Sequence, residues 1–224
     1  MNMGEKTALI LGSSGLIGNE LVQILIEQNN YKKIHLLLRR PIAISDSRCE
    51  VHIVDFDQLE KYPELFKVTD VFCCLGTTIK KAKSKEAFRK VDYVYPIEAA
   101  KLAVQGGAEK FLIVTAMGAN SESFFFYNQV KGEVERSLKS LNIPSLNIFR
   151  PSLLLGERNE FRLGEKMAEK ASRFLNNLMV GPLRSYRAIQ AKSVAKAMSA
   201  IAASNKNGIN IFQSNEIQRI ADKH

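Results

Sequence analysis

The chain has 224 residues, of which 46% are hydrophobic and 25% are charged, a composition typical of a globular protein with a sizeable core. No segment reaches the roughly 18 to 20 consecutive apolar residues of a membrane-spanning helix, and the polar residues 1–7 do not resemble a secretory signal peptide. The three cysteines lack the spacing of a disulfide framework or a zinc site. We therefore expect a cytoplasmic protein without a metal ion and without integral membrane association.

The formal net charge of +9 would suit an anionic small ligand, a nucleic acid or simply a solvated surface. The densest basic stretch, residues 80–90 (KKAKSKEAFRK), carries six lysines and arginines but a single aromatic residue. No nucleic-acid motif surrounds it. We expect a small-molecule partner and no nucleic acid.

The apolar pattern predicts strands and helices in alternation along the chain. An apolar run at residues 7–11 stops at Gly12, and apolar residues at helical spacing follow over residues 16–26. Further strands are predicted at residues 33–38, 50–54, 70–75, 110–115, 145–149 and 208–212. Further helices are predicted at residues 84–105, with Pro96 as a kink or a restart, and at residues 127–141, 161–178 and 189–203.

These elements predict the fold class. Strands that are apolar on successive residues are covered on both faces, and their alternation with helices indicates a parallel sheet built by right-handed crossovers. The expected fold is α/β, a doubly wound parallel sheet of the Rossmann type. Because no linker or repeat divides the chain, we expect a single domain over residues 1–224, in which residues 151–224 form a small substrate-side lobe.

A glycine-rich turn joins the first predicted strand to the first predicted helix. In such a turn, one glycine allows a sharp bend, a second lets the backbone approach a pyrophosphate, and a third lets the helix pack on the strand. The helix N-terminus then attracts the phosphates. The turn predicts a dinucleotide site formed by Gly12, Ser13, Ser14, Gly15, Leu16, Ile17 and Gly18.

The end of the second predicted strand indicates which dinucleotide binds. NAD sites usually place a carboxylate there, whereas NADP sites place an arginine nearby for the 2′-phosphate. Here Arg39 and Arg40 follow the strand, and no carboxylate occurs before Asp46. NADP(H) is therefore favoured over NAD(H), the alternative being that both arginines are ordinary surface residues. Asp55 and Phe56, after the third predicted strand, are expected to meet the adenine.

Tyr127 and Lys131 form the candidate catalytic pair. Residues four apart share one face of a helix, so the phenol and the ammonium group point the same way. A cation beside a phenol favours the phenolate, as an acid–base catalyst requires. Thr115, at the end of the fifth predicted strand, adds a hydroxyl twelve residues earlier. A surface pair that arises by chance is the alternative.

Taken together, Gly-x-x-Gly-x-x-Gly and Tyr-x-x-x-Lys resemble the short-chain dehydrogenase/reductase superfamily, with the glycine spacing of its extended and atypical branches. Shorter stretches are similar to a narrower group of atypical members, the Tat-interacting oxidoreductase type. These stretches are Arg39-Arg40 and residues 54–56 (VDF), 73–78 (CCLGTT), 91–93 (VDY), 131–135 (KGEVE) and 149–151 (FRP). The resemblance covers nearly the whole chain.

The resemblance implies a role for each matching residue. Gly12, Gly15 and Gly18 would hold the pyrophosphate, Arg39 and Arg40 the 2′-phosphate, and Lys131 the nicotinamide ribose. Leu75, Gly76 and Thr77 would line the ribose, and Pro151 and Ser152 would flank the nicotinamide. Tyr127 would be the acid–base, and Thr115 would bind the substrate oxygen where the superfamily usually has serine. Asp92 stands where many relatives have an asparagine.

Three functions fit these observations. The first is an NADP(H)-dependent oxidoreductase that moves a hydride to or from a small carbonyl or alcohol. The second is an NADP(H)-sensing regulatory or scaffold protein with little turnover. The third, a nucleotide-sugar epimerase or dehydratase, usually has a larger C-terminal lobe. Residues 124–126 (FFF) would either wall an apolar substrate pocket or pack into the core, and the protein would be a monomer or a homodimer.

Overall fold

The computed structural model describes residues 6–156 and 187–224. At its centre is a sheet of seven parallel strands in the order β3-β2-β1-β4-β5-β6-β9. The strands are β1 (Thr7–Leu11), β2 (Lys33–Leu38), β3 (Cys49–Ile53), β4 (Asp70–Cys73), β5 (Lys110–Val114), β6 (Ser145–Arg150) and β9 (Gly208–Gln213). The chain runs outward from β1 to β3, returns to the other side of β1 at β4, and then runs outward again. The predicted doubly wound α/β fold is confirmed.

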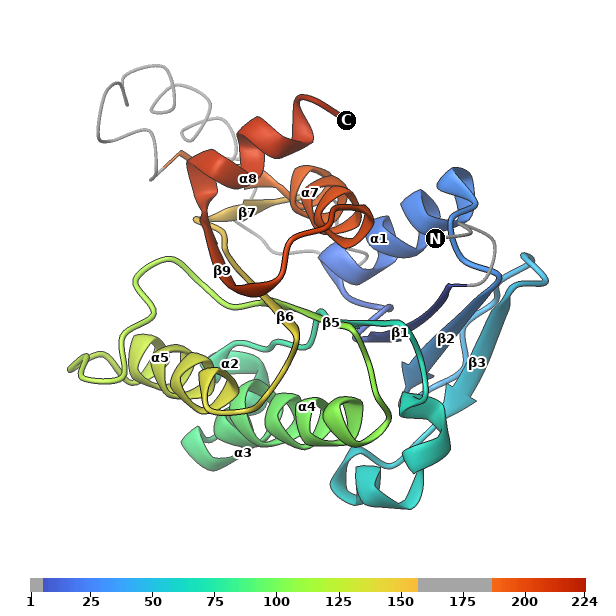
Figure 1. The fold of residues 1–224 in the computed structure, drawn as a ribbon. Coiled ribbons are helices and arrows are strands. Elements are labelled where there is room, and N and C mark those ends of the chain that lie inside the picture. Colours follow the sequence, from blue (N-terminus) through green and yellow to red (C-terminus); the bar gives the residue numbers. More distant parts are fainter. Residues whose placement is uncertain (1–5, 157–186) are drawn as a thin grey trace.

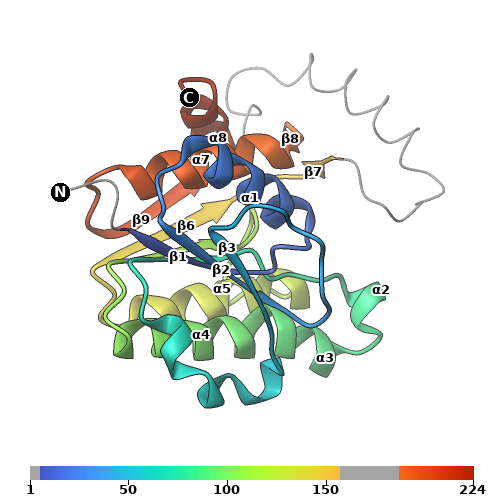
Figure 2. The same ribbon diagram turned by 90° about the vertical axis from the view of Figure 1, so that its right-hand side faces the viewer.

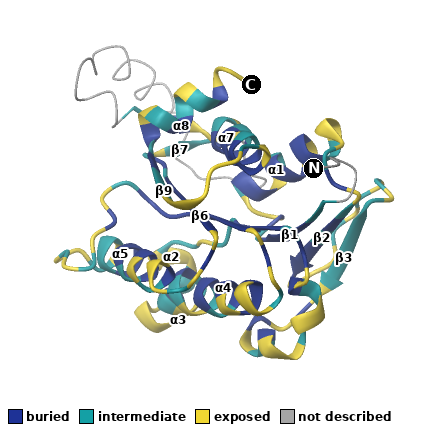
Figure 3. Cartoon of the chain, viewed as in Figure 1, coloured by how far each residue is buried: buried dark blue, intermediate teal, exposed yellow. Residues whose placement is uncertain are grey.

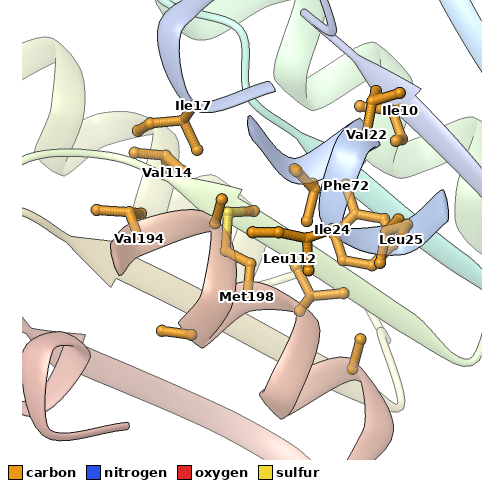
Figure 4. Packing of buried hydrophobic residues seen from close by; sticks show 14 of the residues in the cluster. Ile10, Ile17, Val22, Ile24, Leu25, Phe72, Leu112, Val114, Val194 and Met198 are labelled. Atoms are coloured by element: carbon orange, nitrogen blue, oxygen red, sulfur yellow. The ribbon is translucent and has the colours of Figure 1, made fainter. Parts of the chain in front are cut away.

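Helices cover both faces of this sheet (Figures 1 and 2). One face carries α1 (Leu16–Gln28), α7 (Ala191–Ala203) and α8 (Ser214–Ala221), and the other carries α4 (Tyr95–Gln105) and α5 (Phe126–Lys139). Each layer encloses its own core of buried apolar side chains. In the first core, Leu25 of α1 and Met198 of α7 pack with Phe72 and Leu112 of the sheet (Figure 4).

Burial follows the position of each strand in the sheet (Figure 3). All five residues of the interior strand β5 are buried, which accounts for its continuous apolar run. At the edge, β3 has no fully buried residue. The continuous apolar pattern therefore marks strands that are covered on both faces, as predicted.

The helix predicted over residues 84–105 is three consecutive segments. A short α3 (Lys85–Arg89) is followed by a π-helical segment, η4 (Lys90–Val94), and then by α4. Pro96 comes just after the π-helical segment, and Val94 and Tyr95 before it already have helical backbone angles. The chain therefore does not leave the helix before Pro96, and the helix does not restart there.

Short elements complete the described chain. They are the 3-10 helices η2 (Phe56–Lys61) and η3 (Pro63–Phe66), the helix α2 (Ile79–Ala82), and the two-stranded pair of β7 (Leu154–Leu155) and β8 (Ile189–Gln190). We did not predict α2 or α8. No helix in the described ranges is both long and apolar enough to cross a membrane.

The described part of the C-terminal region belongs to the main layers. β9 pairs with β6 as the seventh strand of the sheet, and α7 packs in the same core as α1. The substrate-side role predicted for residues 151–224 stays a prediction, and the helix predicted over residues 161–178 lies outside the described residues.

Candidate cofactor and active site

The predicted site residues gather at one edge of the sheet. Because all seven strands are parallel, their carboxyl ends lie on the same side, and ligands of such sheets bind there, where the strand order reverses. Here the order reverses between β1 and β4. The residues that follow the strands at this edge are Gly12, Arg39, Asp55, Leu75, Thr115 and Pro151.

The turn after β1 requires glycine for steric reasons. Gly12 has a φ of 83°, and a Cβ there would lie 2.7 Å from the backbone of Cys74. A Cβ on Gly18 would lie 2.2 Å from the carbonyl oxygen of Gly12. The Gly15 N–H donates to that same oxygen at 3.0 Å, which closes the turn. The glycines therefore hold β4, the turn and α1 in close contact.

The N-terminus of α1 has the features of an anion site. Gly15, the N-cap residue, provides no side-chain cap, and the first turn carries no acidic residue. Ser13 is 1% exposed, and its hydroxyl has no hydrogen-bond partner among the described residues. A buried polar group normally has a partner, and free N–H groups at a helix N-terminus favour a phosphate. These residues fit a pyrophosphate.

The other residues of the predicted turn differ in their surroundings. Ser14 is exposed, whereas Ile17 is buried in the core beneath α1. Leu16 is half-buried, and its side chain lies so close to Gly156 that a Cβ there would come within 2.8 Å of it. Leu16 and Ile17 thus position the helix by packing.

Arg39 and Arg40 are exposed after β2. Within residues 6–156 and 187–224, neither guanidinium group makes an ion pair, so both are available to an anion. Arg39 lies close enough to Tyr95 to act on its phenol electrostatically. The pKa of Tyr95 is nevertheless raised, by burial and by the hydrogen bond that the phenol donates to Asp57 at 2.7 Å.

Asp55 and Phe56 are already engaged within the fold. The Asp55 carboxylate caps η2 by accepting from the backbone N–H of Asp57 at 2.9 Å, and it also accepts from Gln58 at 2.7 Å. Phe56 is buried, with its ring centroid 5.6 Å from that of Tyr95. The two residues shape the edge of the site next to Arg39.

Lys131 is held by a buried ion pair. Its ammonium group lies 2.7 Å from Oδ1 of Asp92 in the π-helical segment, and both side chains are almost completely buried. Oδ2 of Asp92 accepts the backbone N–H of Thr77 at 3.0 Å. Burial is the largest single influence and lowers the pKa of Lys131, but Asp92, together with Tyr127 and Cys73, outweighs it, so the pKa is raised. Asp92 thus joins the loop after β4 to α5.

Tyr127 lies one turn before Lys131 and is much more exposed. Its side chain is 36% exposed, and its ring packs on Phe88 with 5.6 Å between the centroids. Tyr127 also acts electrostatically on Lys131, so the two groups are neighbours. The helix therefore leaves the phenol partly exposed while it keeps the cation inside.

Thr115 has a partner that the sequence did not reveal. Its hydroxyl donates to the carboxylate of Glu135 at 2.7 Å, and the carbonyl of Phe149 lies 3.3 Å away. Glu135 also accepts from Arg150, at 2.9 Å from its Nε, and both Thr115 and Glu135 are buried. The hydroxyl that we predicted for a substrate oxygen is thus directed to Glu135.

The remaining predicted residues lie around the loops after β4 and β6. Leu75 and Thr77 are half-buried and Gly76 is exposed, as lining residues would be. Pro151 is buried, and its carbonyl accepts from Met117 at 2.9 Å. The Ser152 hydroxyl donates to the carbonyl of Arg187 and lies 2.9 Å from the Ser214 hydroxyl, so its polar group is engaged within the fold.

Two of the three phenylalanines at the start of α5 are exposed to solvent. Phe124 is 103% exposed and Phe125 is 75% exposed. Phe126 packs on Phe88, with 5.7 Å between the centroids. Packing of at least two of these rings into the core, one of the two alternatives above, is therefore wrong.

Comparison with solved structures reveals similar folds. WbmH of Bordetella bronchiseptica, in complex with NAD⁺, matches with a TM-score of 0.71 and 13% identity over 97% of this chain and 79% of that one. An ADP-L-glycero-D-manno-heptose-6-epimerase of Helicobacter pylori matches with a TM-score of 0.70 and 16% identity over 99% and 83%. At these identities, the likeness concerns the fold alone.

Comparison of sequences identifies nearer relatives. Protein HTATIP2 of Rattus norvegicus is 40% identical over 172 residues, covering 75% of this chain and 71% of that protein. A protein of Candida albicans named FMP52, mitochondrial, is 32% identical over 208 residues, covering 90% of each chain.

The names of the fungal relatives contradict the predicted cytoplasmic location. Proteins of Candida albicans, Debaryomyces hansenii and Scheffersomyces stipitis that match this chain are named as mitochondrial. The prediction was wrong because composition and apolar runs report on membrane spans and secretion, and proteins of many compartments share them. The HIM1 family matches residues 25–182, and the chain therefore belongs to the HIM1 family.

Proposed function

We propose that the chain binds NADP(H) at the carboxyl edge of the sheet and acts as an oxidoreductase of the short-chain dehydrogenase/reductase type. The observation that carries the proposal is the connection from Lys131 through Asp92 to Thr77. It fixes a buried cation at this edge, on the helix that presents Tyr127. A surface pair that arose by chance would need no such support.

The cofactor would lie across the carboxyl ends of the strands. Gly12, Ser13 and the N-terminus of α1 would bind the pyrophosphate, because the free N–H groups and the Ser13 hydroxyl lack other partners among the described residues. Arg39 and Arg40 would bind the 2′-phosphate. The loop from Leu75 to Thr77 would line the ribose, Asp55 and Phe56 would border the adenine, and Pro151 and Ser152 would flank the nicotinamide.

Proton transfer falls to Tyr127 in this proposal. A bound nicotinamide would supply or accept the hydride. The Tyr127 phenol would donate its proton to the carbonyl oxygen in reduction and take it back in oxidation. Lys131, kept charged by Asp92, would stabilise the phenolate. Thr115 would contact the substrate only by giving up its bond to Glu135, so its part in catalysis is secondary.

The substrate is proposed to be a small carbonyl or alcohol compound with an apolar part. Phe124 and Phe125 lie just before Tyr127 in the chain and are exposed, as is Leu153 after β6, at 63%. Exposed apolar side chains beside a candidate site often mark contact with a ligand.

The experiment that tests the proposal is a titration with NADPH and NADH, repeated on the variant Arg39→Ala/Arg40→Ala. We expect NADPH to bind more tightly, and the double variant to lose about tenfold or more in NADPH affinity with little change for NADH, since each charge-assisted contact is worth about 1.5–3 kcal/mol. The control Lys101→Ala/Lys139→Ala removes the same charge from exposed residues of α4 and α5. No binding of either nucleotide would overturn the proposal.

A further inference from the structure

A second cluster of ligand-forming side chains lies on the two outer strands β2 and β3. His35 of β2 is the register partner of Glu50 of β3, and His52 follows two residues later. Side chains two apart in a strand point to the same face. Cys49 and Val51 pack into the core under α1 and α7, so Glu50 and His52 belong to the opposite face.

The three side chains converge on one point. Nδ1 of His35 lies 2.9 Å from Nε2 of His52, and Oε2 of Glu50 lies 3.4 Å from the first nitrogen and 3.8 Å from the second. Ligands of a tetrahedral zinc ion, each about 2.0–2.1 Å from the metal, lie about 3.3 Å apart. A movement of a few tenths of an ångström would therefore bring all three atoms to one ion.

A hydrogen bond between the two imidazoles, 2.9 Å from nitrogen to nitrogen, does not account for the approach of the Glu50 carboxylate to both rings. A neutral imidazole carries one N–H, so a single proton can lie between the two facing ring nitrogens. The Glu50 carboxylate oxygen then faces these nitrogens without a proton of its own to share. Lys33 binds the other carboxylate oxygen, Oε1 of Glu50, at 2.7 Å. That contact orients the carboxylate and leaves Oε2 for the imidazoles, as the outer partner of a metal ligand does.

The cluster is also accessible from solvent. The side chains of His35, His52 and Glu50 are 15%, 25% and 43% exposed, which leaves room for a water ligand.

We propose that His35, Glu50 and His52 bind a divalent transition-metal ion, of which Zn²⁺ is the representative, with water completing the coordination. Two imidazoles and one carboxylate are a ligand set that Zn²⁺ accepts. The ion would bridge β2 and the exposed edge strand β3. This site is independent of the proposed oxidoreductase activity and replaces the expectation of no metal, which rested on cysteine and histidine spacing along the chain.

The test is Zn²⁺ binding by the chelator-treated full chain, free of any histidine tag, measured by equilibrium dialysis and by the visible spectrum of the Co²⁺ form. We expect one equivalent of Zn²⁺, and at least about tenfold weaker binding by His52→Ala and by Glu50→Gln, since loss of even an outer partner costs about 10–100-fold. Far-UV circular dichroism verifies that the variants fold.

The chain offers two matched controls. His224→Ala removes the remaining histidine, and Cys49→Ser removes a thiol on the other face of β3. Both should bind Zn²⁺ like the unmodified chain. Less than stoichiometric Zn²⁺ at saturating concentration would overturn the proposal, and so would loss of binding in either control with His52→Ala unaffected.

Discussion

Tyr127 and Lys131 share one face of α5 but differ strongly in exposure, at 36% and 4%. A group that exchanges a proton with a substrate has to reach it, whereas a cation that stabilises a phenolate acts more strongly when water is excluded. The exposures therefore match the two proposed roles. They also separate this pair from an ordinary surface pair, in which both side chains would be solvated.

Tyr127→Phe tests the role of the phenol. The change removes only the hydroxyl, so we expect turnover of carbonyl substrates to fall by about 10²-fold or more, while NADPH affinity stays within about twofold. NADPH oxidation measured at 340 nm gives the rate, and the titration described above gives the affinity.

Tyr93→Phe is the matched control for that variant, since the Tyr93 hydroxyl lies 3.1 Å from Ser137 Oγ and has no proposed catalytic role. Turnover by Tyr127→Phe equal to that of the unmodified chain would contradict the enzyme and favour a regulatory protein that binds the cofactor without chemistry.

At the scale of elements, Asp92 connects three parts of the fold. It lies in the π-helical segment, accepts from the loop after β4 and pairs with Lys131 of α5. A regular α-helix over residues 84–105, without the π-helical turn, would change which residues face α5. π-helical turns occur often at functional sites. The irregular segment therefore places Asp92 against Lys131 and Thr77 of the candidate site.

Asp92→Asn tests this connection. The variant leaves the buried Lys131 ammonium group without a counter-charge, so we expect the free energy of unfolding to fall by about 3–5 kcal/mol. Urea unfolding measures the loss. The pKa of Lys131 is higher in the folded protein than its ordinary value of 10.5. The stabilisation of the fold by the ion pair is therefore fully present below pH 10.5 and is lost as the pH rises through the pKa of the folded state.

The double variant Asp92→Asn/Lys131→Met distinguishes an unpaired charge from simple misfolding. It removes the buried cation as well, and should recover part of the lost stability. A double variant that is less stable than Asp92→Asn would show that the ion pair is not the cause.

Across the whole molecule, the two ends of the parallel strands carry different kinds of residues. The carboxyl edge carries the proposed cofactor residues, while the amino edge contains a buried acid, Asp70, at the start of β4. Its Oδ2 accepts from Tyr31 at 2.6 Å, and its Oδ1 has no hydrogen-bond partner in the described part of the chain. Burial raises the pKa of Asp70, so its charge at neutral pH costs stability.

Asp70→Asn should therefore stabilise the protein at pH 7. The pKa of Asp70 in the folded protein lies above its ordinary value of 3.8. The gain in the free energy of unfolding should therefore shrink as the pH falls through the pKa of the folded state, and should vanish as the pH approaches 3.8. Urea unfolding between pH 4 and pH 7 measures it. NADPH affinity should not change, because Asp70 is at the other edge of the sheet.

Asp46→Asn is a control in which the expected change of stability at pH 7 has the opposite sign. Hydrogen bonds from Arg48 lower the pKa of Asp46, so its carboxylate stabilises the fold above 3.8 and the variant should lose stability at pH 7. A loss of stability at pH 7 in Asp70→Asn would contradict the assignment of a costly buried charge.

The local features of this protein are predictable from neighbouring residues in its sequence. Short stretches rich in apolar residues and bounded by polar or turn residues predicted the seven strands of the sheet, because such patterns are a property of neighbouring residues. The glycine turn and the i, i+4 pair of Tyr127 and Lys131 were equally local. The tertiary structure decided which distant groups meet: Asp92 with Lys131, Thr115 with Glu135, and His35 with His52. These contacts depend on strand order and helix packing, which are set by burial over the whole chain and not by spacing along it.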